Sequence, residues 1–317
     1  MKNKTYFRLP LILAAVTALS LSCARKGPVE LKLNLAEGTQ KRAQITNRQQ
    51  SIQDFGEEKM ETDQTLKMTY LYRVKEKDKE GNHYIDITYE GIYHKLIGDF
   101  IDFKYDSEDE ERENGDFFAQ AYDALMGKTF SVVISSAGRI KEFSGIDSII
   151  SEITRELTVD EDLGGRMREL LKARFGKGKV RETFRKFFNI YPSGPVKSGD
   201  TWKRSSEKIL GFPMSRQTEY KLRKLSGEYA QIEVQSEIAS PRENEIVYDG
   251  SGYKTEFAGK EEGKIMVDVE TGWIESAEIT QDMEGKVTSI KESQEAVFPV
   301  RVKDKTIFET LEIEDQN

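Results

Sequence analysis

The sequence predicts an α+β protein made mostly of antiparallel β-sheet, with two similar β-rich halves and a central helical block. The halves contain long segments in which apolar and polar residues alternate with the period of two that is typical of half-buried strands. Near the middle, apolar residues instead recur at helical spacing: Ile146, Ile149, Ile150, Ile153 and Leu157.

The first 22 residues have the features of a targeting segment. Three basic residues precede an apolar run, Leu9–Leu21, that is too short to cross a bilayer. The run ends Leu19-Ser20-Leu21-Ser22-Cys23, which resembles a bacterial lipoprotein signal peptide with Ser20 in place of the usual Leu. That resemblance implies lipidation of Cys23, the sole cysteine of the chain; the alternative is a plain secretory signal with an incidental cysteine.

These features predict a protein anchored to the membrane of the cell envelope. No later stretch of the sequence is long and apolar enough to span a bilayer. Ala24, and not Asp, follows the cysteine, so the enteric sorting rule favours the outer membrane, facing the periplasm. A lone cysteine also excludes an intramolecular disulfide and a cysteine-based zinc site.

We expect five segments along the chain. They are a signal peptide (1–22), a lipidated tether (23–29), a first β-rich half (30–143), a helical block (144–191) and a second β-rich half (192–317). Without the three basic residues of the signal peptide, 45 basic and 56 acidic residues remain, a net charge of −11. Such an acidic chain is not expected to bind nucleic acid, because phosphate contacts need a cationic surface.

The positions of the hairpins are predicted from turn-forming residues, mainly glycines. In the first half we expect a long hairpin around Gly81-Asn82, a short helix near Phe117–Leu125 and a hairpin with an Ala137-Gly138 turn. In the second half we expect turns at Ser226-Gly227, Thr271-Gly272 and Glu284-Gly285, and a core Trp202 at a strand entrance. The halves echo one another in these patterns, through either a true duplication or convergent hairpin chemistry.

The central block has three predicted helical segments, separated by Gly164-Gly165 and by Gly176-Lys177-Gly178 and ended by Tyr191-Pro192. From residue 166 to 186 it carries nine cationic and two acidic side chains, a net charge of +7. This run is either a solvated outer face or a contact surface for anionic lipid. We expect the contact residues to be Lys172, Arg181 and Arg185, which lie off the apolar positions.

The sequence motifs identify no catalytic, cofactor-binding or metal-binding residue. Gly127-Lys128-Thr129 lacks the earlier glycine of a phosphate loop, and the acidic run from Asp106 lacks the spacing of a calcium loop. His83 and His94 stand alone at a strand start and a strand end, where surface positions are expected. We therefore expect no enzyme activity and no cofactor.

Three segments, Gly127–Gly145, Tyr191–Trp202 and Gly263–Gly272, resemble those of an uncharacterised family of bacterial exported lipoproteins, a domain of unknown function. The resemblance implies an envelope location and a β-rich fold, and it supplies no catalytic residues. More loosely, long hairpins with helices on one side are similar to the curved half-barrels of bacterial lipid and lipoprotein carriers.

Three functional classes follow from these expectations. The leading one is a non-enzymatic, lipid-anchored envelope protein that binds an apolar or amphiphilic ligand, or a protein partner, on a sheet face. The second is a structural or scaffolding lipoprotein without a ligand. The third is an enzyme whose site is assembled from residues distant in sequence. An unfilled apolar concavity would favour the first class, and converging buried carboxylates would favour the third.

Overall fold

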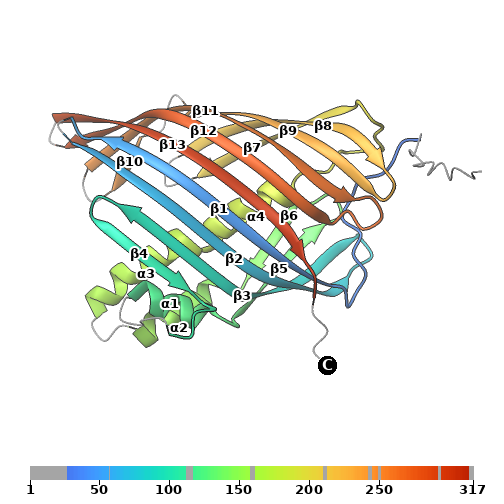
Figure 1. The fold of residues 1–317 in the computed structure, drawn as a ribbon, viewed down its shortest axis with the longest axis horizontal. Helices are drawn as coiled ribbons and strands as arrows, with labels where there is room; N and C mark the ends of the chain where they lie inside the picture. The colour runs from blue at the N-terminus through green and yellow to red at the C-terminus, as the bar shows by residue number, and fades with distance from the viewer. Residues whose placement is uncertain are drawn as a thin grey trace, which may run out of the picture.

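The computed structural model describes residues 27–56, 58–111, 117–157, 161–209, 213–241, 245–248, 251–291 and 294–313. Its strands form one antiparallel sheet in the order β6-β5-β3-β2-β1-β13-β12-β11-β9-β8-β7, with β4 on β3 and β10 on β11 (Figure 1). The strands of the first half are β1 (Gln40–Asp54), β2 (Lys59–Lys77), β3 (Asn82–Gly98), β4 (Ile101–Asp106), β5 (Thr129–Ser135) and β6 (Ile140–Ser144). Those of the second half are β7 (Thr201–Ile209), β8 (Pro213–Ser226), β9 (Tyr229–Ala239), β10 (Ile246–Tyr248), β11 (Ser251–Asp268), β12 (Ile274–Lys291) and β13 (Gln294–Leu311).

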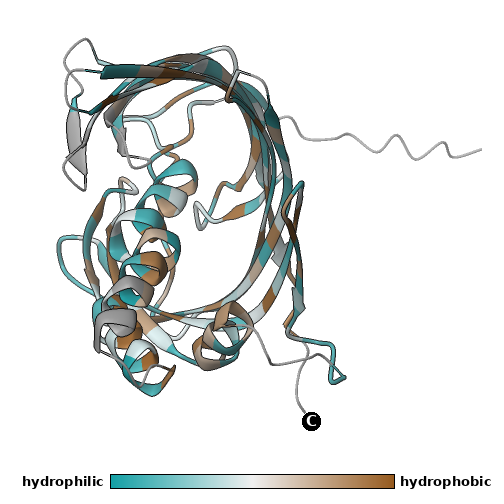
Figure 2. Cartoon of the chain, turned by 90° about the vertical axis from the view of Figure 1, so that its left-hand side faces the viewer, coloured by the Kyte–Doolittle hydropathy of each residue, from teal (hydrophilic) through white to brown (hydrophobic). Residues whose placement is uncertain are grey.

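The sheet curves into an open arc, and helices lie along its open side (Figure 2). They are α1 (Phe117–Leu125), α2 (Ile146–Leu157), α3 (Glu161–Phe175) and α4 (Lys177–Phe188). Because β6 and β7 are the two edges of the sheet and α4 contacts both, this helix bridges the gap that the sheet leaves open. The predicted α+β fold with mostly antiparallel sheet is confirmed, and the sheet is the curved form.

Glycines on the inner face permit the curvature where β11 and β12 pair. Gly259, Gly263 and Gly285 alternate with inward side chains, and neighbouring backbone crowds each of them. A Cβ on Gly259 would lie 2.7 Å from the carbonyl oxygen of Asp282. The strands therefore approach more closely here than any larger residue allows.

One end of the arc is closed by a segment that precedes the sheet. Residues 29–35 run in extended form across this end and bury Val29, Leu31, Leu33 and Leu35. The Leu33 amide donates to the Ser136 carbonyl (2.8 Å) and the Asn34 amide donates to the Thr271 carbonyl (2.7 Å). The segment thereby ties together the β5–β6 and β11–β12 turns, one from each half. We call this the closed end and the opposite end of the strands the open end.

Both halves repeat the same strand order, and both have a glycine of positive φ before the first strand and a register shift in the second. Gly38 (φ 80°) precedes β1 and its amide donates to Val74 of β2, while Gly199 (φ 98°) precedes β7 and its amide donates to Leu222 of β8. A register shift follows Val74 in β2 and Leu222 in β8. β13 then lies between β1 and β12 and joins the halves into one sheet. The five-part division of the chain stays a prediction.

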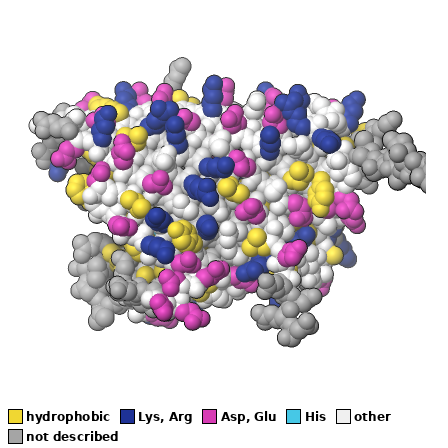
Figure 3. Space-filling view, viewed as in Figure 1, with side chains coloured by type: hydrophobic (Ala, Val, Ile, Leu, Met, Phe, Trp, Pro, Cys, Tyr) yellow, Lys and Arg dark blue, Asp and Glu magenta, His cyan; other side chains and the backbone are white. Residues whose placement is uncertain are grey.

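Charged side chains of both signs are interspersed over the outer face of the sheet (Figure 3). Pairs on adjacent strands form many of its ion pairs, such as Lys305–Glu278 (2.8 Å) and Arg301–Asp282 (3.0 Å). This face has the polar character of a water-facing surface, since alternation along each strand sends its charges outward. None of the helices in the described ranges is long and apolar enough to cross a membrane.

Several predictions of turns, hairpins and helices are confirmed, and two predicted breaks at glycines are wrong. The turn glycines Gly138 and Gly272 have positive φ (73° and 69°), and α1 and the β2–β3 hairpin form as expected. Gly164-Gly165 lies inside α3 and does not separate helices, because a glycine inside a helix costs only about 1 kcal/mol relative to alanine and does not by itself end the helix. Glu284-Gly285 is no turn either: β12 continues through it to Lys291, with Gly285 serving the curvature. The signal peptide and Cys23 lie outside the described residues.

Candidate functional site

A cavity of about 620 Å³ lies between the inner face of the sheet and helices α3 and α4. Strands β1, β2, β12 and β13 form most of its floor, and Arg174, Lys179, Val180 and Lys186 belong to its helical roof. The volume is within the range of roughly 300–1,000 Å³ that is usual for small-molecule sites. The inner face of the arc is therefore only partly filled by its own helices.

Strand register arranges the inner side chains in rows that cross the sheet. Towards the closed end, seven residues in register form an entirely apolar row: Met68, Ile45, Phe308, Ala277, Ile265, Ile232 and Leu222. Two rows nearer the open end (four residues along each strand), seven residues in register form an entirely polar row: Gln64, Gln49, Asp304, Gln281, Glu261, Ser236 and Thr218. We call these the apolar row and the polar row.

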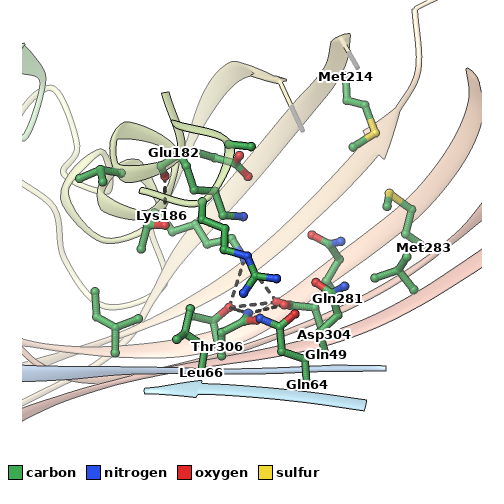
Figure 4. Close-up of a pocket in the computed structure, with 18 of the residues that line it drawn as sticks. Gln49, Gln64, Leu66, Glu182, Lys186, Met214, Gln281, Met283, Asp304 and Thr306 are labelled. Atoms are coloured by element: carbon green, nitrogen blue, oxygen red, sulfur yellow. Dashed lines mark hydrogen bonds and ion pairs between the residues drawn. The ribbon is translucent and has the colours of Figure 1, made fainter. Parts of the chain in front are cut away.

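Charged groups meet at the middle of the polar row. The Lys186 ammonium reaches down from α4 to within 3.6 Å of a carboxylate oxygen of Asp304, and it donates to the Thr306 hydroxyl at 3.3 Å (Figure 4). It also lies 3.6 Å from a carboxylate oxygen of Glu261. Arg216 donates to both carboxylate oxygens of Glu261 at 3.2 and 3.3 Å. Asp304 also accepts from Asn47 and from Thr306. The charges of Lys186, Arg216, Glu261 and Asp304 sum to zero.

Two carboxamides in the same row stay available. Gln49 and Gln64 are half-buried, face one another across β1 and β2, and line the cavity. Within the described residues, neither side chain makes a hydrogen bond to another group of the protein. Each carboxamide offers two N–H donors and an oxygen acceptor to whatever enters the cavity.

Beyond the polar row, the open end of the cavity is apolar. Met214, Ile238 and Met283 form a buried cluster separate from the main core, with Phe257 and Val302 packed against it. Val287, Phe298 and Val300 continue the apolar lining towards the open end. In Figure 4, Met214 and Met283 lie on strands to one side of the Lys186 contacts. Methionine side chains adapt readily to ligands of different shape.

His94 is buried beside this cavity, contrary to the surface position that we expected. The Tyr122 hydroxyl lies 2.7 Å from its Nδ1, and Arg174, a cavity-lining residue, contacts both groups at 3.3–3.4 Å. Burial, with a smaller contribution from the Arg174 charge, lowers the pKa of His94 to about 4. His83 is also buried, and burial lowers its pKa as well. Both predictions failed because an isolated histidine carries no sequence sign of which sheet face it occupies.

The predicted cations on the helices do not form one surface. Lys172 is exposed and pairs with Glu169 at 3.0 Å. Arg181 is half-buried with its guanidinium 5.7 Å above the Phe143 ring, so it takes part in packing, and Arg185 is half-buried. Lys186, from the same run, points into the cavity. Contact of Lys172, Arg181 and Arg185 with anionic lipid stays a prediction.

Trp202 packs at the margin of the core. It is half-buried, stacks on Tyr220 at 5.7 Å, and its indole donates to the Ile190 carbonyl at 2.7 Å. The central tryptophan is Trp273, which is fully buried and lies against Tyr72. Among the described residues, no three His, Cys, Asp or Glu side chains converge in a way that would hold a metal ion.

Sequence reasoning missed the polar row, although a signal for it exists. On five strands that are neighbours in the sheet, a polar residue occupies one of the alternate positions whose side chains face inward, where other positions of the strand carry apolar residues. Asp304 lies between Val302 and Phe308 in this phase, and Gln281 lies between Ile279 and Met283. A single polar residue at an inward-facing position says little about a site. Only the register between strands shows that these polar residues lie in one row.

Comparison with solved structures finds chains of low sequence identity that align with most of this chain. A chain of lipovitellin, from a structure described as showing lipid–protein interactions, aligns with 89% of this chain at 11% identity and a TM-score of 0.47. This chain spans only 26% of that lipovitellin chain. OccK5 (OpdH) of Pseudomonas aeruginosa aligns over all of its own length and 87% of this chain, at 10% identity and a TM-score of 0.23. No curated protein matches. A family model matches residues 80–274, more than half of the sequence, and the chain therefore belongs to the Family of unknown function (DUF6263).

Proposed function

We propose that this protein binds an amphiphilic molecule in the cavity between its curved sheet and helices α3 and α4. The observation that carries the proposal is the unfilled, apolar open end. Phe298, Val300 and Val302 of β13 line the cavity and are only half-buried, whereas Phe308, at the closed end of the same strand, is fully buried against Phe187 of α4. Apolar surface left in this state gains free energy, about 25 cal/mol per Å², when a ligand covers it.

The site favours binding over the two rival classes. A scaffold without a ligand would gain from a filled two-layer core, and the cavity argues against one. An enzyme would need a carboxylate free to exchange protons, whereas the two carboxylates of the polar row, Glu261 and Asp304, are each held in ion pairs with cations. The absence of enzyme activity is part of the proposal.

The proposal is tested by filling the cavity from one strand. Val300 faces inward opposite Gly285, so a larger side chain there has room to extend into the cavity. Val297, on the same strand, is 51% exposed on the outer face and gives a matched control. We expect Val300→Trp to weaken binding of an uncharged fluorescent probe, N-phenyl-1-naphthylamine, at least tenfold, and Val297→Trp to leave it unchanged.

The measurement uses the purified full-length protein, delipidated and placed in nanodiscs, with native mass spectrometry of the protein before delipidation as a second readout. Wild type and Val297→Trp should carry a co-purifying amphiphile that Val300→Trp lacks. Equal probe binding by all three proteins, or no binding by any, would contradict the proposal.

We also propose that the protein is a lipoprotein of the cell envelope, anchored through Cys23 in the outer membrane and facing the periplasm. The support is the signal-peptide pattern together with a described fold that begins at Val29, which leaves a short tether. Cys23→Ala should abolish incorporation of a labelled fatty acid and release the protein from membranes. Unchanged maturation and membrane retention of the variant would overturn the anchor. A protein partner in the envelope is the alternative occupant of the sheet face.

A further inference from the structure

We infer that the cavity selects a single-chain amphiphile whose head carries no net charge, either neutral or zwitterionic, and holds that head on the polar row with the chain towards the open end. The inference rests on the proposed function, because it names the ligand class of the same cavity. Three features carry it: the position of the polar row, its charge balance and the free carboxamides.

The direction of the ligand follows from what lies on each side of the polar row. On the closed side, the cavity meets residues that are already packed, such as Ile45 (6% exposed) and Tyr70 (4% exposed). On the open side, Phe298, Val300 and Val302 are only half-buried and line an apolar channel. An acyl chain gains more by covering the open side, because there the apolar surface is still in water. Its head then lies at the polar row.

The charge preference follows from the ion network. Lys186, Arg216, Glu261 and Asp304 neutralise one another, and their side chains are at most about one-tenth exposed. A ligand head with a net charge would add an uncompensated charge to this buried group, which is costly where water is excluded. A neutral head adds none, and a zwitterionic head brings its own counter-charge. Of the other charged residues that line the cavity, Lys179 is exposed, and Arg174 and Glu182 carry opposite charges; Arg174 also contacts Tyr122 and the Phe118 ring.

The free carboxamides supply the recognition that such a head needs. Gln49 and Gln64 present donors and acceptors together, so they suit hydroxyl, ester or amide groups, which combine both roles. The space is limited: at roughly 30 Å³ per water-sized group, a cavity of about 620 Å³ holds on the order of 20 non-hydrogen atoms. That is room for one chain and a small head.

The test compares amphiphiles that share a dodecyl chain and differ only in the head, each below its critical micelle concentration. The heads are monoglyceride (neutral), phosphocholine (zwitterionic), carboxylate (anionic) and trimethylammonium (cationic). Displacement of N-phenyl-1-naphthylamine from the full-length protein in nanodiscs is measured, with Val300→Trp protein as the blank for partition into the disc. We expect the neutral and zwitterionic heads to bind at least tenfold more tightly than either charged head.

Two variants with matched controls locate the preference. Gln49→Leu/Gln64→Leu should weaken monoglyceride binding about tenfold, while Gln50→Leu, one residue away on the outer face, should leave monoglyceride binding unchanged. Asp304→Asn leaves the network with a net charge of +1 and should shift the preference towards the carboxylate head. Asp282→Asn, on the outer face beside Arg301, should not.

The outcomes separate the two proposals. If the probe does not bind to wild-type protein, the cavity is not a ligand site and both proposals fail. If the probe binds but the four heads compete equally, or a charged head competes best, the proposed function stands and the inference about the head is wrong. A Gln49→Leu/Gln64→Leu protein that binds monoglyceride as tightly as wild type would likewise overturn it.

Discussion

The two ends of the sheet share one alternation pattern and differ in what covers it. At the closed end, Phe184, Phe187 and Phe188 of α4 pack onto the inner face beside Trp273, and the apolar row beneath them is buried. At the open end, the inward residues include Met283, Val300 and Phe298, and α4 presents Lys179, Glu182 and Thr183 to the cavity. One end is a packed core and the other borders a cavity, because the side chains of α4 change from aromatic to polar along its length.

The largest expected difference is the cost of truncating one large side chain at each end. Trp273→Ala should lower the free energy of unfolding by about 3–5 kcal/mol, since it leaves a void in a close-packed aromatic cluster. Met283→Ala should cost about 1–2 kcal/mol, because its neighbourhood already borders a cavity. Urea denaturation of both variants measures the contrast. Equal losses would show that the open end is packed as tightly as the closed end.

Closure of the closed end depends on backbone contacts at the turn glycines. Gly272 has φ 69°, and a Cβ there would overlap the carbonyl oxygen of Lys32 in the segment that seals this end. Gly272→Ala should cost about 3 kcal/mol, from conformational strain and displacement of that segment.

Gly199 gives the matched control for this substitution. It has φ 98° and nothing within 4 Å of a Cβ position, so Gly199→Ala should cost only about 1 kcal/mol. Thermal melts that rank the two variants in the reverse order would refute the role of the seal.

His94 lies between the two ends of the sheet: it occupies the row next to the polar row, on the side of the closed end. Its pKa is about 4 in the folded protein and about 6.5 in the unfolded chain. Between these values the unfolded state binds more protons, so this contribution to stability is fully present above about pH 6.5 and is lost as the pH falls towards 4. At about pH 5 the loss reaches about 2 kcal/mol.

The substitution His94→Gln should remove the pH dependence that His94 gives to the free energy of unfolding. The stability difference between wild type and His94→Gln should therefore narrow from about pH 7.5 to about pH 5, as followed by urea denaturation at each pH. A constant difference across this range would mean that His94 is not held neutral. His83→Gln gives a comparison at the closed end.

The smallest expected effect concerns the outer cations of the helices. Lys172→Glu should weaken the salt-sensitive part of binding to anionic vesicles by about 1 kcal/mol without changing stability, since Lys172 is exposed. Arg181→Glu should instead lower stability, because it removes the contact with the Phe143 ring. The control is Lys203→Glu, at an exposed position on β7. Binding is measured by co-sedimentation with vesicles, using the full chain with Cys23→Ala as the background for each variant. Equal binding by all these proteins would mean that the cationic residues from 166 to 186 form only a solvated surface.

The glycine turns, the helical block and the alternating strands were predictable from the sequence, because each depends on residues close together in the chain. Gly138 and Gly272 adopt positive φ for local reasons, and the apolar face of α4 follows from its 3.6-residue period. The sequence also determined that charges alternate outward along the strands. Predictions from sequence were wrong where tertiary packing, and not local conformation, explains a residue. At Gly285 a turn was expected, but glycine is required because the neighbouring strand approaches closely.

The cavity and its polar row were decided only by the tertiary structure. Gln64, Gln49, Asp304, Gln281 and Glu261 come from five strands spread over about 255 residues of sequence (304 − 49), and hydrogen-bond register brings them into line. The placement of β13 between β1 and β12 creates this alignment, and α4 supplies Lys186 to the middle of it. Side-chain period along one strand is a local property, whereas register between strands is set by the packing of the whole sheet.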